Sequence, residues 1–326
     1  MKITAYNCRP DELEYFDRFA AQYGVELALR KEPAKPENAG DAEGSLCISI
    51  VVSPMKAELL RRLHGLGVRY VSTRSIGYDH IDLGAAKEIG LHVGNVSYTP
   101  DSVADYAVML ILMAARKVKG ILLKSAAQDF SLAGVRGTVL SRLTVGVVGT
   151  GHIGRAVIRR LSAFGCRILA YDPYENDEVK RSAEYVPLDR LLAESSVITL
   201  HVPATRENYH LIGASAFAKM KDGAILVNTA RGSLVDTDAL IGAVESGRLG
   251  GAALDVVEHE NGLYYNNLTG KALSNRGLAV LKFFPNVIVT PHTAFYTDQS
   301  VSDMVENSIK SCKLFAEGEK NPWQLV

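Results

Sequence analysis

The chain has 326 residues, of which 47% are hydrophobic and 22% charged, the composition of an ordinary globular protein. Its 36 basic residues balance 36 acidic ones, so nothing indicates a nucleic-acid or anionic-membrane partner. The four cysteines lack CxxC or other metal-ligand spacing, and we expect no metal site. Because the N-terminus has no signal-peptide core and no apolar stretch is long enough to cross a bilayer, we expect a cytoplasmic protein.

The first hundred residues alternate short β-rich runs with helix-length segments. We predict a loop over residues 32–44, helices over 11–23, 55–66 and 83–89, and strands over 2–6, 47–52, 68–72 and 92–95. Such a βα alternation favours a parallel sheet with helices on both faces.

Residues 101–119 follow Pro100 and are typical of one long helix, with an apolar stripe from Val103 to Val118. A second βα series has predicted strands at 145–148, 168–171, 197–201, 224–228, 251–255 and 287–290. The amphipathic helix predicted over 299–315 could return to the first series. We therefore predict an α/β protein with two Rossmann-like, doubly wound parallel-sheet domains. A flavodoxin-like first domain would comprise residues 1–100 and 297–326, and an inserted second domain residues 101–296.

The most informative stretch is residues 143–172, in which an apolar run, a glycine turn, a helix-like segment and a second apolar run end on Asp172. Within the turn GTGHIG, Gly149 permits the sharp bend, Gly151 lets the backbone approach a pyrophosphate, and Gly154 lets helix and strand pack closely. The helix N-terminus offers N–H groups to phosphates. Asp172 can accept hydrogen bonds from the adenosine ribose and would repel a 2′-phosphate, so we predict NAD rather than NADP.

Three polar residues follow predicted strands of the second series, namely Arg231 in NTARG, Glu260 in DVVEHE and His292 in TPHTAFYT. Open α/β sheets bind ligands at the carboxyl ends of their strands. Arg can bind a carboxylate and polarise a carbonyl, His can protonate a forming alkoxide, and Glu can favour the imidazolium and orient its ring. Each residue could singly be an ordinary surface or turn residue, but their shared position favours reduction of a 2-oxo acid.

The order of GTGHIG, YD, HVP, NTARG, DVVEHE and TPHTAFYT resembles the D-2-hydroxyacid dehydrogenases, and within them the D-lactate dehydrogenases, including the vancomycin-resistance branch. The resemblance extends from STRSIGYDHID and NVSYTPDSVADY to the last helix. It implies a two-domain fold with its site in the interdomain cleft, a homodimer, NAD as cofactor, and NADH-dependent reduction of pyruvate to D-lactate. Arg231 would bind substrate, Glu260 would pair with the catalytic histidine, and His292 would donate the proton.

The resemblance also implies substrate contacts in the first domain. Ile76 and Gly77 would offer backbone N–H groups to the substrate carboxylate, although an ordinary strand-to-helix turn is an alternative. Tyr98 would face the substrate side chain, or could be a packed loop aromatic, and Tyr296 would be a second aromatic neighbour.

For the cofactor, the resemblance implies contacts from the glycine turn GTGHIG and from the segments that follow other predicted strands of the second series. These are Gly149, Gly151, His152, Ile153, Gly154, Asp172, Val202, Pro203, Asn208, Thr229, Ala230, Arg231 and Asp255. For Asp255, a loop cap is an alternative interpretation. His80 and His201 are better explained as a helix-start and a strand-end residue than as metal ligands, because no ligand set surrounds them.

Three functions stay open at this point. The first is a D-lactate dehydrogenase, the second a related enzyme for a bulkier branched or aromatic 2-oxo acid, and the third an NADH-sensing, corepressor-like protein without activity. The apolar-striped helix after Pro100 supports a homodimer, but it could instead be buried within one subunit.

Overall fold

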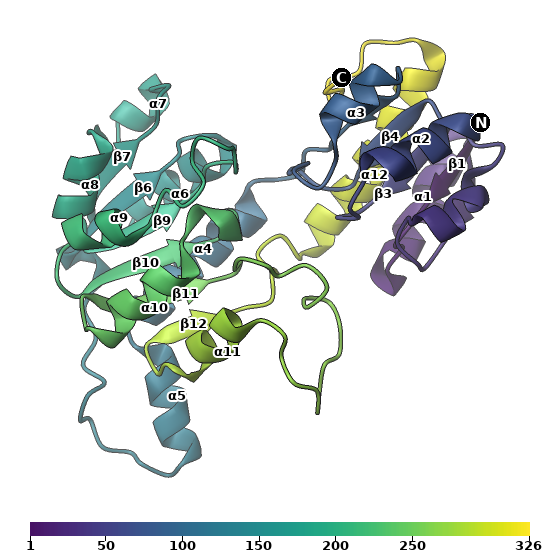
Figure 1. Ribbon diagram of the computed structural model, residues 1–326. Helices are drawn as coiled ribbons and strands as arrows, with labels where there is room; N and C mark the ends of the chain where they lie inside the picture. The colour runs from purple at the N-terminus through teal and green to yellow at the C-terminus, as the bar shows by residue number, and fades with distance from the viewer. The chain divides into compact units, whose positions relative to one another are not determined.

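The computed structural model describes residues 1–326, and the chain divides into two compact units (Figure 1). Unit 1 comprises Met1–Thr99 and Tyr296–Val326, and unit 2 comprises Pro100–Phe295. None of the helices combines the length and hydrophobicity that crossing a membrane would require.

Unit 1 is built on a five-stranded parallel sheet in the order β2-β1-β3-β4-β5, the flavodoxin-like order. Its strands are β1 (Lys2–Ala5), β2 (Glu26–Leu29), β3 (Cys47–Ile50), β4 (Tyr70–Thr73) and β5 (His92–Gly94). Its helices are η1 (Pro10–Glu12), α1 (Leu13–Tyr23), η2 (Pro36–Ala42), α2 (Ala57–Gly65), α3 (Leu83–Glu88) and α12 (Asp298–Glu317). Apolar clusters fill both faces of this sheet, one under α2 and α3 and the other under α1 and α12.

Unit 2 contains a seven-stranded parallel sheet in the order β12-β11-β10-β9-β6-β7-β8. Its strands are β6 (Thr144–Val148), β7 (Arg167–Tyr171), β8 (Glu184–Tyr185), β9 (Val197–Leu200), β10 (Ala224–Asn228), β11 (Leu249–Leu254) and β12 (Val287–Val289). The chain reverses direction across the sheet between β6 and β9, the switch point at which doubly wound folds bind dinucleotides. The predicted fold class is confirmed for both sheets.

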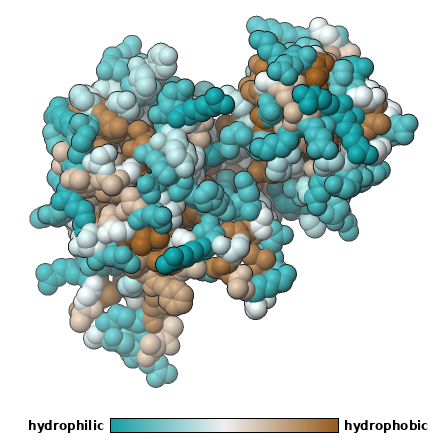
Figure 2. All heavy atoms as spheres, in the orientation of Figure 1, coloured by the Kyte–Doolittle hydropathy of each residue, from teal (hydrophilic) through white to brown (hydrophobic).

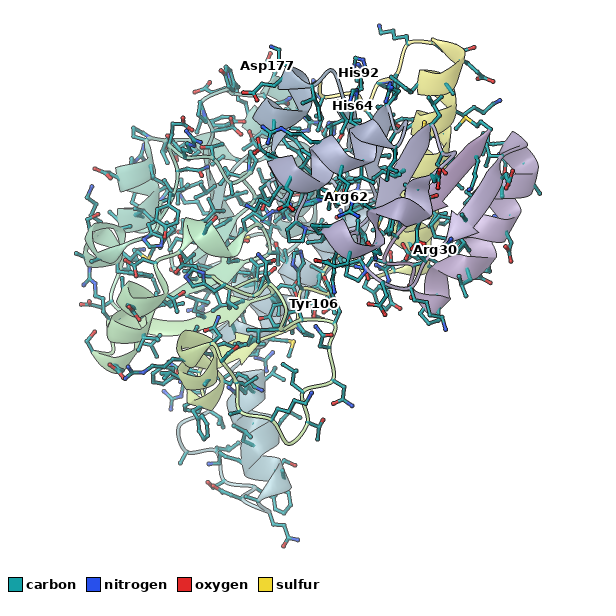
Figure 3. The ribbon with its side chains drawn as sticks, turned by 45° about the vertical axis from the view of Figure 1, so that its right-hand side comes forward. Arg30, Arg62, His64, His92, Tyr106 and Asp177 are labelled. Atoms are coloured by element: carbon teal, nitrogen blue, oxygen red, sulfur yellow. The ribbon has the colours of Figure 1, made fainter.

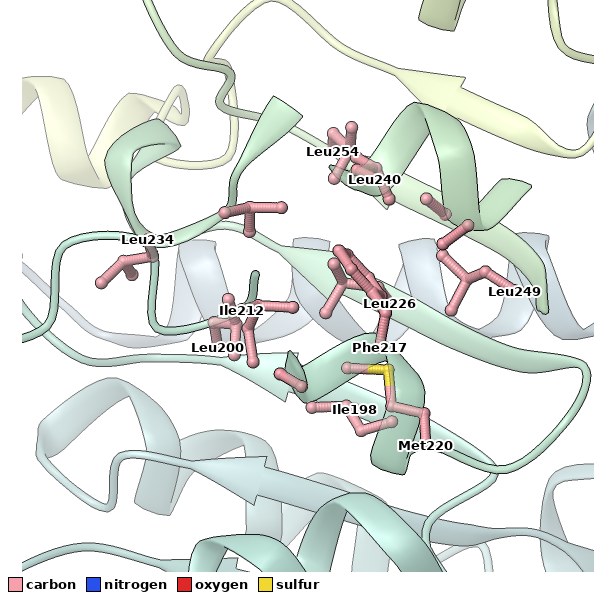
Figure 4. Packing of buried hydrophobic residues seen from close by; sticks show 14 of the residues in the cluster. Ile198, Leu200, Ile212, Phe217, Met220, Leu226, Leu234, Leu240, Leu249 and Leu254 are labelled. Atoms are coloured by element: carbon pink, nitrogen blue, oxygen red, sulfur yellow. The ribbon is translucent and has the colours of Figure 1, made fainter. Parts of the chain in front are cut away.

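Helices cover both faces of the unit 2 sheet. They are α4 (Asp101–Ala115), α5 (Val118–Ala126), η3 (Leu140–Arg142), α6 (His152–Ser162), α7 (Asp177–Lys180), α8 (Leu188–Glu194), α9 (Ala214–Lys219), η4 (Gly232–Leu234), α10 (Thr237–Glu245) and α11 (Arg276–Phe283). Residues of α4 and α6 pack on one face, and residues of α8 to α11 on the other (Figure 4). Neighbouring strand residues such as Leu226 and Val227 point to opposite faces, so both sides of β10 are apolar.

The predicted single helix over residues 101–119 is wrong in one respect, because the chain breaks between α4 and α5. Lys117 adopts a left-handed conformation, with φ at 54°. Its N–H bonds back to the carbonyl of Ala114, which closes α4 with a tight turn before α5 begins. The apolar pattern continues across the break, so periodicity gave no sign of it.

Candidate active site

The glycine turn joins β6 to α6 at the switch point of the unit 2 sheet. Gly149 has φ at 96°, and a Cβ at this residue would lie 2.6 Å from the carbonyl oxygen of His201. A Cβ on Gly154 would overlap the carbonyl oxygen of Gly149, so only glycine lets α6 approach β6 this closely. A Cβ on Gly151 would meet nothing within 4 Å. The turn is therefore open beside Gly151, where the N-terminal amides of α6, including those of His152 and Ile153, have no acceptor within the helix.

Asp172 lies immediately after β7 and is held against this turn. Its Oδ2 accepts hydrogen bonds from the backbone N–H of Thr150 at 2.7 Å and from the Thr150 hydroxyl at 3.2 Å. Its Oδ1 accepts from the Tyr174 N–H at 2.9 Å. A carboxylate offers roughly four acceptor positions, so Asp172 keeps capacity for a further donor such as a ribose hydroxyl.

The loop after β9 contains Val202, Pro203 and Asn208. The Asn208 side chain accepts from the Thr205 N–H at 2.8 Å and donates to the carbonyl of Pro203 at 2.7 Å, so it braces the loop from within. At the end of β9, burial lowers the pKa of His201 to about 3, so that its ring is neutral. Its Nε2 lies 2.9 Å from the hydroxyl of Thr199. His201 is therefore a strand-end residue that packs within unit 2.

A buried asparagine shapes the loop after β10. Asn228 accepts from the Ala230 N–H at 3.0 Å and donates to the carbonyl of Arg231 at 2.8 Å. The guanidinium of Arg231 also donates to the Ala230 carbonyl at 2.8 Å. Next to them, the hydroxyl of Thr229 is buried without a hydrogen-bond partner. Because an unsatisfied buried hydroxyl is costly, this atom indicates a site where a bound group supplies the missing partner.

Asp255 is fully buried directly after β11 and organises the segment that carries His292. Its carboxylate accepts from the Thr290 hydroxyl at 2.6 Å and from the N–H groups of Thr293 and Ala294, both at 2.9 Å. Its own carbonyl accepts from the N–H of His292 at 2.8 Å. Of the two interpretations of Asp255, these bonds favour the loop cap. The cap holds His292 in a left-handed conformation, with φ at 53°.

Glu260 and His292 form a hydrogen-bonded pair. His292 Nδ1 donates to Glu260 Oε1 over 2.6 Å, while Glu260 Oε2 accepts from the Val257 N–H at 2.9 Å. The two side chains are 24% and 20% exposed, so the pair is accessible to a small ligand. Because Nδ1 is engaged, Nε2 is the ring nitrogen that can exchange a proton with a bound molecule. A Cβ on Gly232 would overlap the backbone carbonyl of Val257, so the segment following Arg231 packs directly on the one that leads to Glu260.

The substrate-side residues predicted from the resemblance lie in unit 1. The Ile76 carbonyl accepts from the Asn95 side chain at 2.8 Å and the Gly77 carbonyl accepts from the Ser75 hydroxyl at 2.7 Å. No acceptor in the chain takes the N–H of either Ile76 or Gly77. The bond from Asn95 fixes the peptide plane that carries the Gly77 N–H. The Ser75 carbonyl accepts from the Val96 N–H at 3.2 Å, which fixes the plane that carries the Ile76 N–H, and both N–H groups stay available for a ligand.

The two predicted tyrosines differ in their surroundings. Tyr98 is half-buried, and Tyr296 is 50% exposed with the Arg9 guanidinium 5.7 Å from its ring centroid. Neither the burial of Tyr98 nor the contact of Tyr296 with Arg9 identifies a ligand, so the role of both residues as substrate neighbours stays a prediction.

Sequence reasoning missed two interactions around the catalytic candidates. Tyr106 of α4 (labelled in Figure 3) forms a hydrogen bond with the hydroxyl of Thr293, over 3.0 Å, beside His292. His210 donates from Nε2 to Glu258 Oε1 at 2.7 Å, a second histidine–carboxylate pair. Both Tyr106 and Glu258 belong to motifs that carry the family resemblance. Membership in these motifs is the sequence signal that could have identified the two residues.

Comparison with known proteins assigns this geometry to a family of dehydrogenases. The family model described as "D-isomer specific 2-hydroxyacid dehydrogenase, NAD binding domain" matches residues 108–294. A D-specific alpha-keto acid dehydrogenase of Enterococcus faecium is 48% identical over 98% of both chains. An aromatic 2-oxoacid reductase of Clostridium sporogenes is 43% identical over 97% of this chain and 96% of its own. The crystal structure of a D-lactate dehydrogenase from Treponema pallidum superposes with a TM-score of 0.89 at 32% identity, over the whole of both chains.

Proposed function

Because this chain belongs to the D-isomer specific 2-hydroxyacid dehydrogenase family, we propose that it reduces pyruvate to D-lactate with NADH, in a reversible reaction. The family is one of oxidoreductases, and NAD is its cofactor. The observation that carries the proposal is the Glu260–His292 pair, an oriented proton donor at the carboxyl end of a dinucleotide-binding sheet.

The residues of unit 2 fit NAD. The open turn at Gly151 and the first amides of α6 would hold the pyrophosphate, and Asp172 would accept a ribose hydroxyl. The unpartnered hydroxyl of Thr229 would gain a partner from the bound dinucleotide. Further contacts would come from residues that line the same loops, namely His152, Ile153, Val202, Pro203, Asn208 and Ala230, whereas the buried Asp255 would act by holding the segment of His292. When bound, NADH supplies the hydride for the reduction.

The protein's own groups would then bind and protonate the substrate. Arg231 would hold the substrate carboxylate and carbonyl oxygen with its forked N–H donors. As hydride reaches the carbonyl carbon, His292 Nε2 would give its proton to the carbonyl oxygen, forming the hydroxyl of the product. Glu260 would stabilise the imidazolium before this transfer and hold the ring afterwards, until solvent restores the proton. Positioned acid catalysis of this kind contributes about 10²–10⁴-fold.

Residues of unit 1 would complete substrate recognition. The N–H groups of Ile76 and Gly77 suit a carboxylate, since no acceptor in the chain takes them and bonds to Asn95 and Val96 fix their peptide planes. Tyr98 and Tyr296 would lie beside the substrate side chain and limit its size.

A second candidate function keeps this chemistry with a bulkier 2-oxo acid. It is favoured by the 43% identity to an aromatic 2-oxoacid reductase, and the 48% identical relative is named for alpha-keto acids in general. The side chain of the preferred substrate is therefore the variable to measure.

The deciding experiment is a panel of 2-oxo acids, from pyruvate through branched acids to phenylpyruvate, assayed with NADH and NADPH. We expect the highest kcat/KM with pyruvate and NADH, and a D-configured product. A higher kcat/KM with phenylpyruvate would replace the first proposal by the second. Binding of NADH without oxidation by any acid in the panel would favour the NADH-sensing alternative.

We also propose that the protein forms a homodimer through the α5 region of unit 2. Ile121, Leu122 and Leu123 of α5 are 41%, 60% and 52% exposed, and Phe130 and Leu132 beyond it are 79% and 87% exposed. Figure 2 shows apolar side chains gathered on the part of the surface where Figure 1 places α5. The same helix borders a mostly apolar cavity of about 420 Å³. Such an exposed apolar surface is typical of an interface.

Sedimentation velocity tests the dimer. We expect a species of twice the chain mass, converted to a monomer by Leu122→Asp. A wild-type monomer at micromolar concentration would contradict the proposal.

A further inference from the structure

Glu258 is a nearly buried carboxylate two residues before Glu260. Its side chain is 10% exposed and receives three short hydrogen bonds. His210 Nε2 donates to Oε1 at 2.7 Å, and Thr237 donates to Oε2 from its N–H at 3.0 Å and from its hydroxyl at 2.8 Å. Burial raises the pKa of Glu258, but the bonds from His210 and Thr237 outweigh it and lower the pKa overall. Glu258 is therefore a carboxylate anion with hydrogen bonds to both of its oxygens.

These bonds join three loops that carry the proposed site. We call residues 201–211 the cofactor loop, residues 229–236 the arginine loop and residues 256–260 the carboxylate loop. Through its side chain, His210 ties the cofactor loop to the carboxylate loop. Through its backbone N–H, which donates to the Ser233 carbonyl at 2.9 Å, the same residue ties the cofactor loop to the arginine loop.

The carboxylate and arginine loops are also in direct contact. A Cβ on Gly232 would collide with the backbone at Val257 and Glu258, so the two loops touch without a side chain between them. Beneath this contact, Ile212 and Leu234 belong to one buried apolar cluster, and the N–H of Ile212 donates to the Leu234 carbonyl at 2.9 Å (Figure 4). Buried apolar packing around Ile212 and Leu234 therefore supports the contact between the arginine and carboxylate loops.

The conformation of His210 indicates that its position is specified. Its φ is 53°, a left-handed conformation that must be stabilised by its surroundings. Its ring stacks on Tyr209 with centroids 3.9 Å apart, and its Nδ1 lies 3.6 Å from a carboxylate oxygen of Asp236. The imidazole is thus held between two carboxylates and an aromatic face.

We propose that Glu258 and His210 act as a positioning pair, which fixes the backbone that orients Glu260 and Arg231 for the reaction. The inference rests on the proposed function. Glu258 directly follows Val257 in the chain. The N–H of Val257 donates to Glu260 Oε2, and Glu260 Oε1 in turn holds His292. On the other side, the N–H of His210 holds the arginine loop, which contains Arg231, through the carbonyl of Ser233. Neither Glu258 nor His210 takes part in proton transfer.

The test compares Glu258→Ala with Glu258→Gln in the full-length protein. A displacement near 1 Å of catalytic groups can cost about 10²-fold in rate, so we expect Glu258→Ala to lower kcat for pyruvate by about 10- to 100-fold. Because Asp172 and the first amides of α6, which do not contact the pair, would still hold NADH, its Kd, measured by fluorescence titration, should stay within about threefold. Glu258→Gln keeps an oxygen that accepts from Thr237 and should recover most of kcat.

Asp238→Asn is the matched control, because this exposed carboxylate lies in the same turn of α10 as Thr237. It removes a nearby negative charge without removing a bond to the positioning pair, and we expect unchanged kcat. Should Glu258→Ala fail to fold, His210→Phe carries the same expectation, since it keeps the stack on Tyr209 but cannot donate to Glu258.

Three results would overturn the inference. The first is a kcat of Glu258→Ala equal to that of the wild type. The second is a loss of kcat in Glu258→Gln as large as that in Glu258→Ala. The third is a loss of kcat in Glu258→Ala that is matched by an equal loss of NADH affinity. Wild-type protein that oxidises NADH with none of the 2-oxo acids would instead overturn the proposed function, and the inference with it.

Discussion

Unit 1 contains a fully buried ion pair whose loss should be measurable. Arg74, directly after β4, and Glu12 of η1 have side chains with no exposed surface, and their Nε and Oε1 lie 3.0 Å apart. The guanidinium also donates to Ser49 Oγ at 3.0 Å and to the carbonyls of Tyr6 at 3.0 Å and Asn7 at 3.2 Å. All three guanidinium nitrogens of Arg74 thus donate hydrogen bonds, and the carboxylate of Glu12 balances the positive charge.

Glu12→Gln keeps the shape and one acceptor oxygen but leaves the buried guanidinium without its counter-charge. Removing one partner of a buried pair costs about 3–5 kcal/mol, and the retained acceptor places our expectation near 3 kcal/mol. The only tryptophan of the chain, Trp323, belongs to unit 1, so its fluorescence in a urea titration follows this unit. With a slope of about 1–3 kcal/mol per molar urea, the unfolding midpoint should fall by roughly 1–3 M.

Asp41→Asn is the control, because it breaks a pair with Arg30 in the same unit whose side chains are 38% and 40% exposed. A surface pair contributes at most about 1 kcal/mol, so its midpoint should change little. The double variant Glu12→Gln with Arg74→Met removes both charged groups and should recover most of the loss. Equal midpoints for Glu12→Gln and Asp41→Asn would refute the reasoning.

Three further predictions concern the site. His292→Asn should lower kcat by about 10²–10⁴-fold while NADH still binds in a fluorescence titration, and a loss below tenfold would argue against its role as the acid. Asp172→Ser should raise the ratio of kcat/KM with NADPH to that with NADH, and an unchanged ratio would contradict its role in cofactor choice. The pKa of His201 falls from 6.5 to about 3 on folding because of burial, so the neutral form is favoured in the folded state. The free energy of unfolding should therefore decrease as pH falls from 6.5 toward 3, and calorimetry should show a smaller decrease for His201→Gln.

The sequence predicted ten of the twelve strands, including the edge strands β5 and β12, most of whose residues are buried. β3 and β4 are buried at every position, and such strands produce continuous apolar runs. The missed strands, β2 and β8, are both at a sheet edge, where residues such as Glu26 and Glu184 are exposed and the apolar run disappears. The break at Lys117 was also missed, because a backbone turn leaves the apolar periodicity of α4 and α5 intact.

The sequence by itself determined the doubly wound fold class. It also determined that candidate functional residues follow the strands, namely Asp172, Arg231, Glu260 and His292. These features have local causes, since a short run of residues is enough to specify a strand end or a glycine turn. The family resemblance already implied that Glu260 pairs with His292, but only the tertiary structure showed the geometry of this pair and brought His210 to Glu258. Glu260 and His292 are 32 residues apart and His210 and Glu258 are 48 apart, yet each pair closes to within 2.7 Å. No local pattern encodes such distances, because packing of the whole sheet and its helices sets where each loop ends.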